Sequence, residues 1–243
     1  MIGFIGYGNI GSALVRAFLS HGVPADEIMI STRSPEKLRP LLEEYDISVV
    51  NQDEVQTADI LFLCVRSSDA LNVLKQLTSF KGHLVSINGG ILLEDLSSVY
   101  SGPVTKVMPP LTIEVGRGIV LLCHNRICPT SKTVEELFSK VCIVENLPEC
   151  EFPVVESITG CAPAFFAKFA ELLAESSGLS PDESLKMAKE TLIATAMLLD
   201  ERKLSLNDLI KKVATEGGIT EKGLQVMDDE LPPIVRKMFE RMH

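Results

Sequence analysis

The first twelve residues constrain the fold more than any other stretch of the chain. Residues 2–5 form a short apolar run, and residues 6–12 continue it with the glycine spacing GxGxxG. A strand that leads through such a turn into a helix is typical of dinucleotide-binding folds, although a glycine turn that binds no nucleotide is the alternative. Gly6 would make the tight turn, Gly8 would let the backbone approach a pyrophosphate, and Gly11 would let the helix pack closely on the strand. The helix start would then offer N–H groups and a positive dipole end to the phosphates. The residues that we assign to this cofactor-binding turn are Gly6, Tyr7, Gly8, Asn9, Ile10 and Gly11.

Strand-like and helical patterns alternate through about the first 150 residues. Residues 60–65 are continuously apolar, as expected of a parallel strand that is buried on both faces. This alternation predicts an α/β fold with a Rossmann-type doubly wound sheet. The other strand candidates are residues 27–31, 47–50, 84–87, 104–107, 119–123 and 141–144. A helix is predicted to begin at 32–37, and further helices are predicted near 93–100 and near 131–139.

The pattern changes after the proline-containing segment 147–153. Beyond it the chain has helical periodicity and no convincing strand. We therefore predict two domains: a dinucleotide-binding Rossmann domain at 1–150 and an all-helical domain for substrate binding and dimerisation at 151–243. The residues 185–199 are apolar around much of the helix circumference, which predicts that a partner subunit covers them. The predicted helices are residues 163–175, 181–199, 205–214 and 220–242.

The residues after the second strand candidate indicate the cofactor. A fold that prefers NAD places a carboxylate there to hold the ribose 2′-hydroxyl, but this chain has Thr32, Arg33 and Ser34. An arginine with neighbouring hydroxyls suits a 2′-phosphate. We therefore predict NADP (NADPH), with NAD as the alternative if Arg33 is only a solvated charge. Val65 and Arg66 follow the next buried strand at its carboxyl end, where ligands of such sheets lie.

Charge and composition exclude several function classes. The net charge of −10 and the pI near 5.0 argue against long-range attraction to nucleic acid or to an anionic membrane. Apolar runs have strand length rather than the ~20 residues of a membrane span. Because the first strand begins at the start of the chain, no signal peptide is expected, and we predict a cytoplasmic protein. The six cysteines and four histidines form no metal-ligand spacing, so we predict no metal and reduced, mostly buried thiols.

Three separated segments are similar to those of pyrroline-5-carboxylate reductases, in the same order. Residues 6–13 read GYGNIGSA and resemble the family's GxGNMGxA turn. Residues 159–166 read TGCAPAFF and resemble its SGSGPAYFF segment. Residues 213–220 read VATEGGIT and resemble VTSPGGTT. These segments touch both predicted domains.

The resemblance implies a Rossmann domain followed by a helical domain that interlocks with a second subunit. It also implies hydride transfer from NADPH or NADH to a cyclic imine, most simply 1-pyrroline-5-carboxylate, which becomes proline. The partners would be a small imine or amino-acid substrate and a second copy of the chain, as a homodimer or a higher oligomer built from it. Carried over by position, Met108 and Pro109 lie close to the cofactor, and the substrate contacts fall on Thr159, Gly160, Cys161, Ala162, Pro163, Gly217 and Gly218.

Thr215 and Thr220 fall where the family has hydroxyls near the substrate. We assign them as candidate catalytic contacts, with Thr220 donating to the ring nitrogen or the carboxylate. A helix N-cap is the alternative role for both hydroxyls. An iminium carbon is already electrophilic, so such an enzyme chiefly has to position it and exclude water.

Departures from the family pattern leave two other functions open. Pro110 replaces an asparagine after the sixth strand, and Cys161 and Ala162 replace Ser and Gly in the substrate segment. One alternative is therefore a relative that binds a dinucleotide for regulation without turnover. The other is a reductase of the β-hydroxyacid dehydrogenase type with Lys168 as acid and base, although Lys168 is better placed to pair with Glu171 at i, i+3.

Overall fold

The computed structural model describes all 243 residues and divides into two compact units, Met1–Gly160 and Cys161–His243. The division follows Gly160, whereas the sequence places the domain boundary after residue 150. The boundary at 150 stays a prediction.

The first unit is built on one eight-stranded sheet in the order β3-β2-β1-β4-β5-β6-β7-β8. All neighbouring strands are parallel except β6 and β7, which pair antiparallel. The chain runs outward from β1 to β3 and returns to β4 on the other side of β1. This reversal is the switch point of a doubly wound sheet, and the predicted fold class is confirmed. The strands are β1 (Ile2–Ile5), β2 (Ile28–Ser31), β3 (Ser48–Val49), β4 (Ile60–Leu63), β5 (His83–Ser86), β6 (Val104–Met108), β7 (Ile119–His124) and β8 (Ile143–Asn146).

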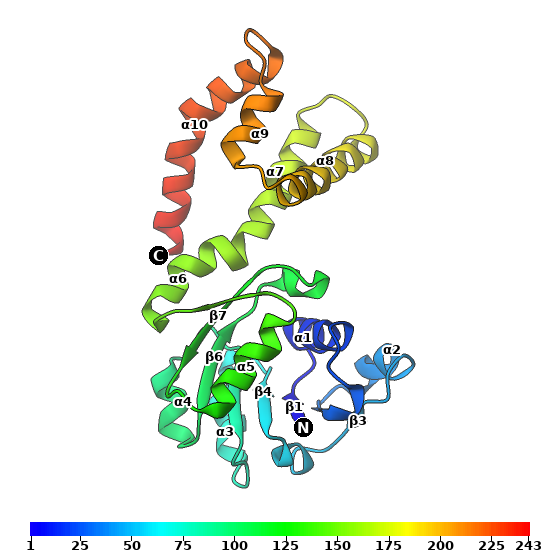
Figure 1. Cartoon of the computed structure of the whole chain (residues 1–243), viewed down its shortest axis with the longest axis vertical. Helices are drawn as coiled ribbons and strands as arrows, with labels where there is room; N and C mark the ends of the chain where they lie inside the picture. The colour runs from blue at the N-terminus through cyan, green and yellow to red at the C-terminus, as the bar shows by residue number, and fades with distance from the viewer. The chain divides into compact units, whose positions relative to one another are not determined.

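Helices cover both faces of this sheet (Figure 1). Successive strand residues point to opposite faces, so Phe4 packs with the helices α1 and α5, while Ile5 packs with α3 and α4. The helices are α1 (Asn9–Ser20), α2 (Arg39–Leu42), α3 (Ser67–Gln76), α4 (Leu93–Val99) and α5 (Pro129–Ser139). The helix that the sequence predicts to open at 32–37 is short, because the segment forms a 3-10 turn (Pro35–Leu38) and a single α-turn that contains Pro40.

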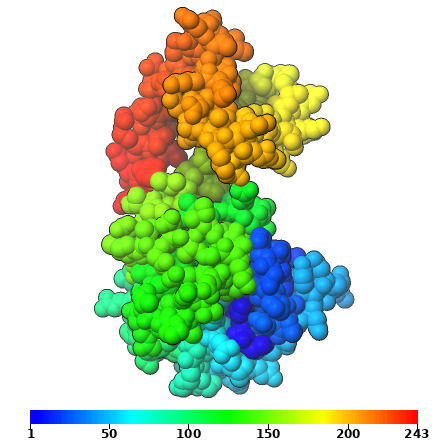
Figure 2. Space-filling view, viewed as in Figure 1, coloured from blue at the N-terminus to red at the C-terminus, as the bar shows by residue number.

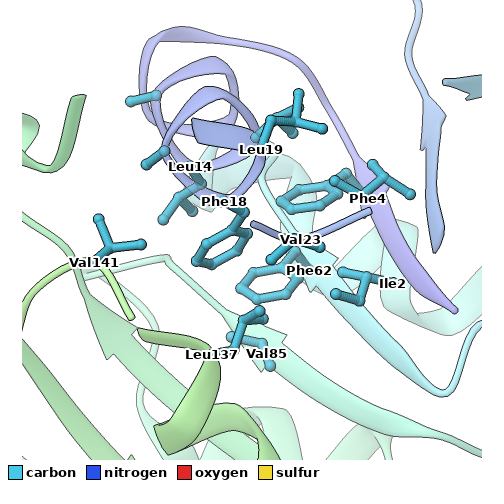
Figure 3. Packing of buried hydrophobic residues seen from close by; sticks show 14 of the residues in the cluster. Ile2, Phe4, Leu14, Phe18, Leu19, Val23, Phe62, Val85, Leu137 and Val141 are labelled. Atoms are coloured by element: carbon cyan, nitrogen blue, oxygen red, sulfur yellow. The ribbon is translucent and has the colours of Figure 1, made fainter. Parts of the chain in front are cut away.

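Four phenylalanines fill the core between α1, α5 and the sheet. Figure 3 labels three of them, Phe4, Phe18 and Phe62. The Phe4 and Phe62 rings stack with centroids 4.7 Å apart, and Phe18 meets the edge of Phe138 at 5.4 Å. All four side chains are fully buried. The rings hold α1 against the centre of the sheet, and the glycine turn joins this helix to β1.

The second unit contains the helices α7 (Ala162–Glu175), α8 (Pro181–Arg202), α9 (Leu206–Val213) and α10 (Ile219–Met242). The sequence predicts that the first of these begins at Pro163, but the helical backbone already starts with α6 (Phe152–Glu156) and continues through a π-turn (Ser157–Cys161). Pro163 has no N–H to donate to the preceding turn, and its ring crowds the carbonyl there. The wider π-turn accommodates the proline within a continuous helical run.

The cysteines are all free, but the prediction that they are mostly buried is wrong. Five are only partly buried and Cys150 is exposed. Only Cys123 lies within a strand; the other five lie in loops, turns or helix caps, where a thiol more easily keeps contact with solvent. No helix is both long and apolar enough to cross a bilayer. No group of three or more His, Cys, Asp or Glu side chains is placed to hold a metal ion.

A buried polar chain crosses the amino ends of β5 and β6 and the carboxyl end of the antiparallel strand β7. The His83 Nε2 atom lies 2.6 Å from Thr105 Oγ1, and Thr105 Oγ1 lies 2.7 Å from His124 Nδ1. The His124 Nε2 atom lies 3.0 Å from Glu135 Oε1. Burial, together with the nearby His124 and Arg126, lowers the pKa of His83 to about 4.

This shift predicts acid destabilisation. The unfolded chain protonates this histidine near pH 6.5 and the folded chain only near pH 4, so stability falls as the pH drops between these values. The expected loss between pH 7 and pH 4.5 is about 2 kcal/mol, measured by urea unfolding at both pH values. His83→Gln should lower the slope of the unfolding free energy with pH by the equivalent of up to about one bound proton. His21→Gln at an exposed site is the control, and equal pH dependence in both variants would contradict the assignment.

Candidate functional site

The turn after β1 requires glycine at two of its three motif positions. Gly6 has φ +98°, a conformation that L side chains rarely adopt, and an added Cβ would lie 2.6 Å from the Cys64 carbonyl oxygen. Its N–H donates to the Ser31 carbonyl at 2.8 Å, so the turn is held between the ends of β2 and β4. A Cβ on Gly11 would lie 2.9 Å from the Gly6 carbonyl oxygen. These contacts explain both glycines by close backbone approach.

Gly8 differs from its neighbours because nothing lies within 4 Å of the position where its Cβ would be. Its dihedrals, φ −91° and ψ −164°, are open to any residue. Gly8 is the N-cap of α1, and no side chain caps this helix start or places a carboxylate in its first turn. The backbone N–H groups of Asn9 and Ile10 therefore receive no side-chain cap and lie at the positive end of the helix dipole. Tyr7 packs its side chain into the core, so this residue offers a ligand only its backbone.

The three polar residues after β2 lie on the same edge of the sheet as this turn. Thr32 Oγ1 accepts the Ser34 N–H at 3.2 Å, which shapes the loop. The Arg33 side chain is 88% exposed and its Nη2 lies 3.4 Å from Asp69 Oδ2 in the first turn of α3. Such an exposed ion pair contributes little to stability, so the guanidinium is available to an anion.

The residues after β4 also reach the glycine turn. A Cβ on Gly6 would lie 3.3 Å from Val65 Cγ1, and Arg66 is the exposed N-cap of α3. Burial raises the pKa of the neighbouring Cys64 thiol, which keeps it uncharged. The structure thus gathers the residues assigned after β1, β2 and β4 on one edge of the sheet.

A second group at this edge lies beyond β4. Met108 ends β6, and its Cε is 3.0 Å from the position of a Cβ on Gly89. Pro110 is buried, and its Cγ lies 2.7 Å from the position of a Cβ on Gly118. The departure from the family's asparagine therefore fills a packed position beside a glycine with φ +134°.

Two further polar residues lie within this group, and no motif in the sequence marks them. Asn88 is buried; its Nδ2 donates to the Leu63 carbonyl at 3.2 Å, and its Oδ1 accepts from Ser67 Oγ at 3.4 Å. Lys106 is buried in the middle of β6. The only sequence signals were the Asn-Gly-Gly turn after β5 and a lysine inside an apolar strand.

The segment assigned to the substrate is helical rather than a loop. Thr159 Oγ1 donates to the Val155 carbonyl at 3.1 Å, which places this hydroxyl on the helix rather than free. Cys161 ends the π-turn, and Ala162 and Pro163 begin α7. The sequence predicts that a helix starts at 159–163 and leaves its N–H groups unpaired. This is wrong, because the helical backbone of α6 continues through the π-turn into α7. Irregular π-turns often occur at functional sites.

The last substrate segment joins α9 to α10 within the second unit. Gly217 has φ +72° and its N–H donates to Glu221 Oε2 at 2.7 Å. Gly218 is the N-cap of α10 and donates to the Thr215 carbonyl at 2.9 Å. No hydroxyl caps this helix, so the N-cap alternative for Thr215 and Thr220 is excluded.

Lys168 lies on the exposed face of α7 and donates to Glu171, as the i, i+3 spacing predicts. The Glu171 carboxylate raises the pKa of Lys168. A lysine with a raised pKa is a poor acid and base near neutrality, which argues against the β-hydroxyacid dehydrogenase alternative.

Two protein-family models match this chain, one in each half. The model described as NADP oxidoreductase coenzyme F420-dependent matches residues 1–88. The model described as pyrroline-5-carboxylate reductase dimerisation matches residues 149–243.

Individual relatives match over nearly the whole chain. Pyrroline-5-carboxylate reductase 3 of Bacillus subtilis (strain 168) is 30% identical over 255 residues, which cover 99% of this chain and 93% of the relative. ComE operon protein 4 of the same organism is 26% identical over 255 residues, covering 100% and 93%. A solved structure of Plasmodium falciparum pyrroline carboxylate reductase with NADP bound superposes with a TM-score of 0.83 at 23% identity, covering 99% of this chain and 94% of that one.

Proposed function

Because this chain belongs to the pyrroline-5-carboxylate reductase family, we propose that it uses NADPH to reduce 1-pyrroline-5-carboxylate to proline. The observation that carries the cofactor half is the uncapped start of α1 beside the open space at Gly8. A pyrophosphate needs both close backbone approach and unpaired N–H donors, and this turn offers both. An added Cβ at Gly8 would fill the same space.

The phosphates of NADPH would be held by residues that follow β1 and β2. The N–H groups of Asn9 and Ile10 suit the pyrophosphate, and Arg33 with the Thr32 hydroxyl suits a 2′-phosphate. When bound, the dinucleotide supplies a hydride to the electrophilic imine carbon. The chain has then to orient the imine and exclude water, which requires no strongly acidic or basic side chain.

The substrate residues remain a proposal. The π-turn with Thr159 and Gly160, continued by Cys161, Ala162 and Pro163, would hold the substrate carboxylate. Gly217, Gly218 and the hydroxyls of Thr215 and Thr220 would contact the ring. In support, neither hydroxyl is used as a helix cap, which leaves them available to a ligand.

The decisive assay follows NADPH oxidation at increasing concentrations of 1-pyrroline-5-carboxylate. We expect saturable, substrate-dependent turnover with proline as the product, and weaker activity with NADH. NADPH binding without any substrate-dependent oxidation would contradict the proposal. That result would support the non-catalytic dinucleotide-binding alternative, which the substitutions at Pro110, Cys161 and Ala162 motivate.

Arg33→Ala tests the cofactor preference. Losing a charge-assisted contact to the 2′-phosphate should weaken NADPH about tenfold to a hundredfold. NADH affinity should change little, because NADH lacks this phosphate. Lys140→Ala, which removes the same charge near the amino end of the sheet, is the matched control. Equal losses for both cofactors, measured by calorimetric titration, would eliminate the 2′-phosphate contact.

The second unit supports a homodimer, or a higher oligomer built from it. Its helices, which run from yellow-green to red in the space-filling view of Figure 2, carry large apolar side chains. Several of these remain exposed, including Phe166 at 60% and Met187 at 58%. A cavity of about 410 Å³ between α7 and α8 is lined by Phe166, Leu173 and Met187 among others. An unpartnered apolar surface of this kind is a liability in a monomer. Sedimentation at low micromolar concentration should give at least a dimer, and a stable monomer would contradict this assembly. Separately, we propose that the protein works in the cytoplasm, because all six of its cysteines are free thiols, as is usual in a reducing compartment.

A further inference from the structure

A buried lysine lies below the functional edge of the sheet. The Lys106 side chain is only 4% exposed, although a buried ammonium is costly unless it is paired and hydrogen-bonded. Its Nζ donates to Glu149 Oε1 at 2.6 Å and to the Gly89 carbonyl at 3.1 Å. It also lies 6.0 Å from the centre of the Phe152 ring. The Glu149 carboxylate, the Gly89 carbonyl and the Phe152 ring therefore compensate the buried charge.

Gly89 belongs to the turn that follows β5, at the carboxyl edge of the sheet. A doubly wound sheet binds a dinucleotide across the switch point, with one half of the cofactor on each side. The β1–β2 side carries the phosphate residues described above, so the nicotinamide falls on the side of β4, β5 and β6. The turn of Asn88 and Gly89 is on that side, in contact with Ser67 and Met108.

Glu149 belongs to the segment between β8 and α6. Both of its carboxylate oxygens lie 3.0 Å from Leu93 N, whose N–H donates to them at the start of α4. Glu149 thus joins Lys106 to the helix that follows the β5 turn.

Glu156 extends the same neighbourhood to the π-turn. Burial raises the pKa of Glu156, and the nearby Lys106 charge opposes this shift. The Glu156 Cγ atom lies 3.1 Å from the position of a Cβ on Gly160. One ammonium therefore neighbours both the nicotinamide side of the dinucleotide edge and the helix that leads into the substrate segment.

We propose that Lys106 is a positioning residue for hydride transfer, because it fixes the Gly89 turn against the segment that carries Glu149 and the π-turn. The inference rests on the proposed reductase function. It differs from a purely structural cross-link of α4, which would affect stability alone. Displacing reacting groups by about 1 Å can cost about a hundredfold in rate, so a small shift of this turn is enough.

The test removes the Lys106 ammonium together with its partner carboxylate on Glu149, so that no buried charge is left unpaired. In Lys106→Met/Glu149→Gln both charges are lost, while the glutamine oxygen can still accept the Leu93 N–H. We expect this variant to fold, with a kcat about tenfold to a hundredfold lower and a Kd for NADPH about tenfold higher. Lys106→Arg keeps a cation that can reach both partners and should recover most of the loss. Lys132→Met, which removes an exposed lysine paired with Glu136, is the control and should change neither value.

Two outcomes overturn the proposal. One is a neutral pair variant with wild-type kcat and NADPH affinity, and the other is a variant whose only defect is a lower melting temperature. Measuring affinity by NADPH fluorescence separates this proposal from the function itself. If the wild-type protein oxidises no NADPH with the imine, the proposed reaction fails, while the affinity comparison still decides whether Lys106 positions the dinucleotide turn.

Discussion

A Gly8→Val variant is expected to fold normally and to lose NADPH binding. No atom lies within 4 Å of the new Cβ, and the φ of −91° with ψ of −164° is available to valine. The added methyl groups would occupy the space in front of the uncapped N–H groups of α1, where the pyrophosphate has to approach. We expect the affinity to fall at least about a hundredfold, which is about 3 kcal/mol, in a calorimetric titration.

Gly8→Ala is the graded companion to this variant. A single methyl group should weaken binding less than valine does, while urea unfolding of both variants should match that of the wild-type protein. Unchanged affinity in Gly8→Val would mean that the turn is only structural and that the nucleotide, if any, binds elsewhere.

The opposite result is expected two residues earlier. Gly6→Val should unfold the protein or destabilise it by about 3 kcal/mol or more, since valine would have to adopt φ +98° and its Cβ would lie 2.6 Å from the Cys64 carbonyl oxygen. The clash is with backbone that belongs to the sheet, so the turn cannot relax cheaply. Urea unfolding and circular dichroism measure this effect.

The pair separates stability from binding. If Gly6→Val were as stable as the wild-type protein, the left-handed turn would not be needed for the fold. If Gly6→Val lost stability but Gly8→Val did not lose affinity, the turn would be a structural element alone. The expected pattern is a stability defect at Gly6 and a binding defect at Gly8.

Local signals were sufficient to predict the centre of the sheet and the turn. The apolar run at 60–65 and the spacing of Gly6, Gly8 and Gly11 are properties of a few neighbouring residues, and the structure uses them much as predicted. The edges were less predictable. β3 has only two residues, and the helix predicted at 32–37 is interrupted because tertiary packing and Pro40 decide its length.

Site residues were predictable from the sequence only where the type of one residue and its position after a strand are enough to suggest its role. Arg33 follows a strand, and its position after β2 was visible in the sequence. Lys106 was not, since its role depends on Glu149, which is 43 residues away along the chain. The π-turn was missed for a similar reason: Pro163 favours a first helical turn, and only the continuous helix from Phe152 shows that the proline is accommodated inside a longer run.

The burial of Tyr7 in the glycine turn also gives the protein a built-in optical reporter. The chain has three tyrosines and no tryptophan, so its ultraviolet emission comes from tyrosine alone. Of the three, Tyr7 lies within the turn itself, whereas Tyr100 follows α4 and stacks on Phe80. The reduced nicotinamide of NADPH absorbs at wavelengths that overlap the long-wavelength side of tyrosine emission, so NADPH binding at this turn should quench Tyr7. Nucleotide binding can therefore be followed in the unlabelled protein, and a Tyr7→Phe variant would identify the part of the signal that comes from the turn.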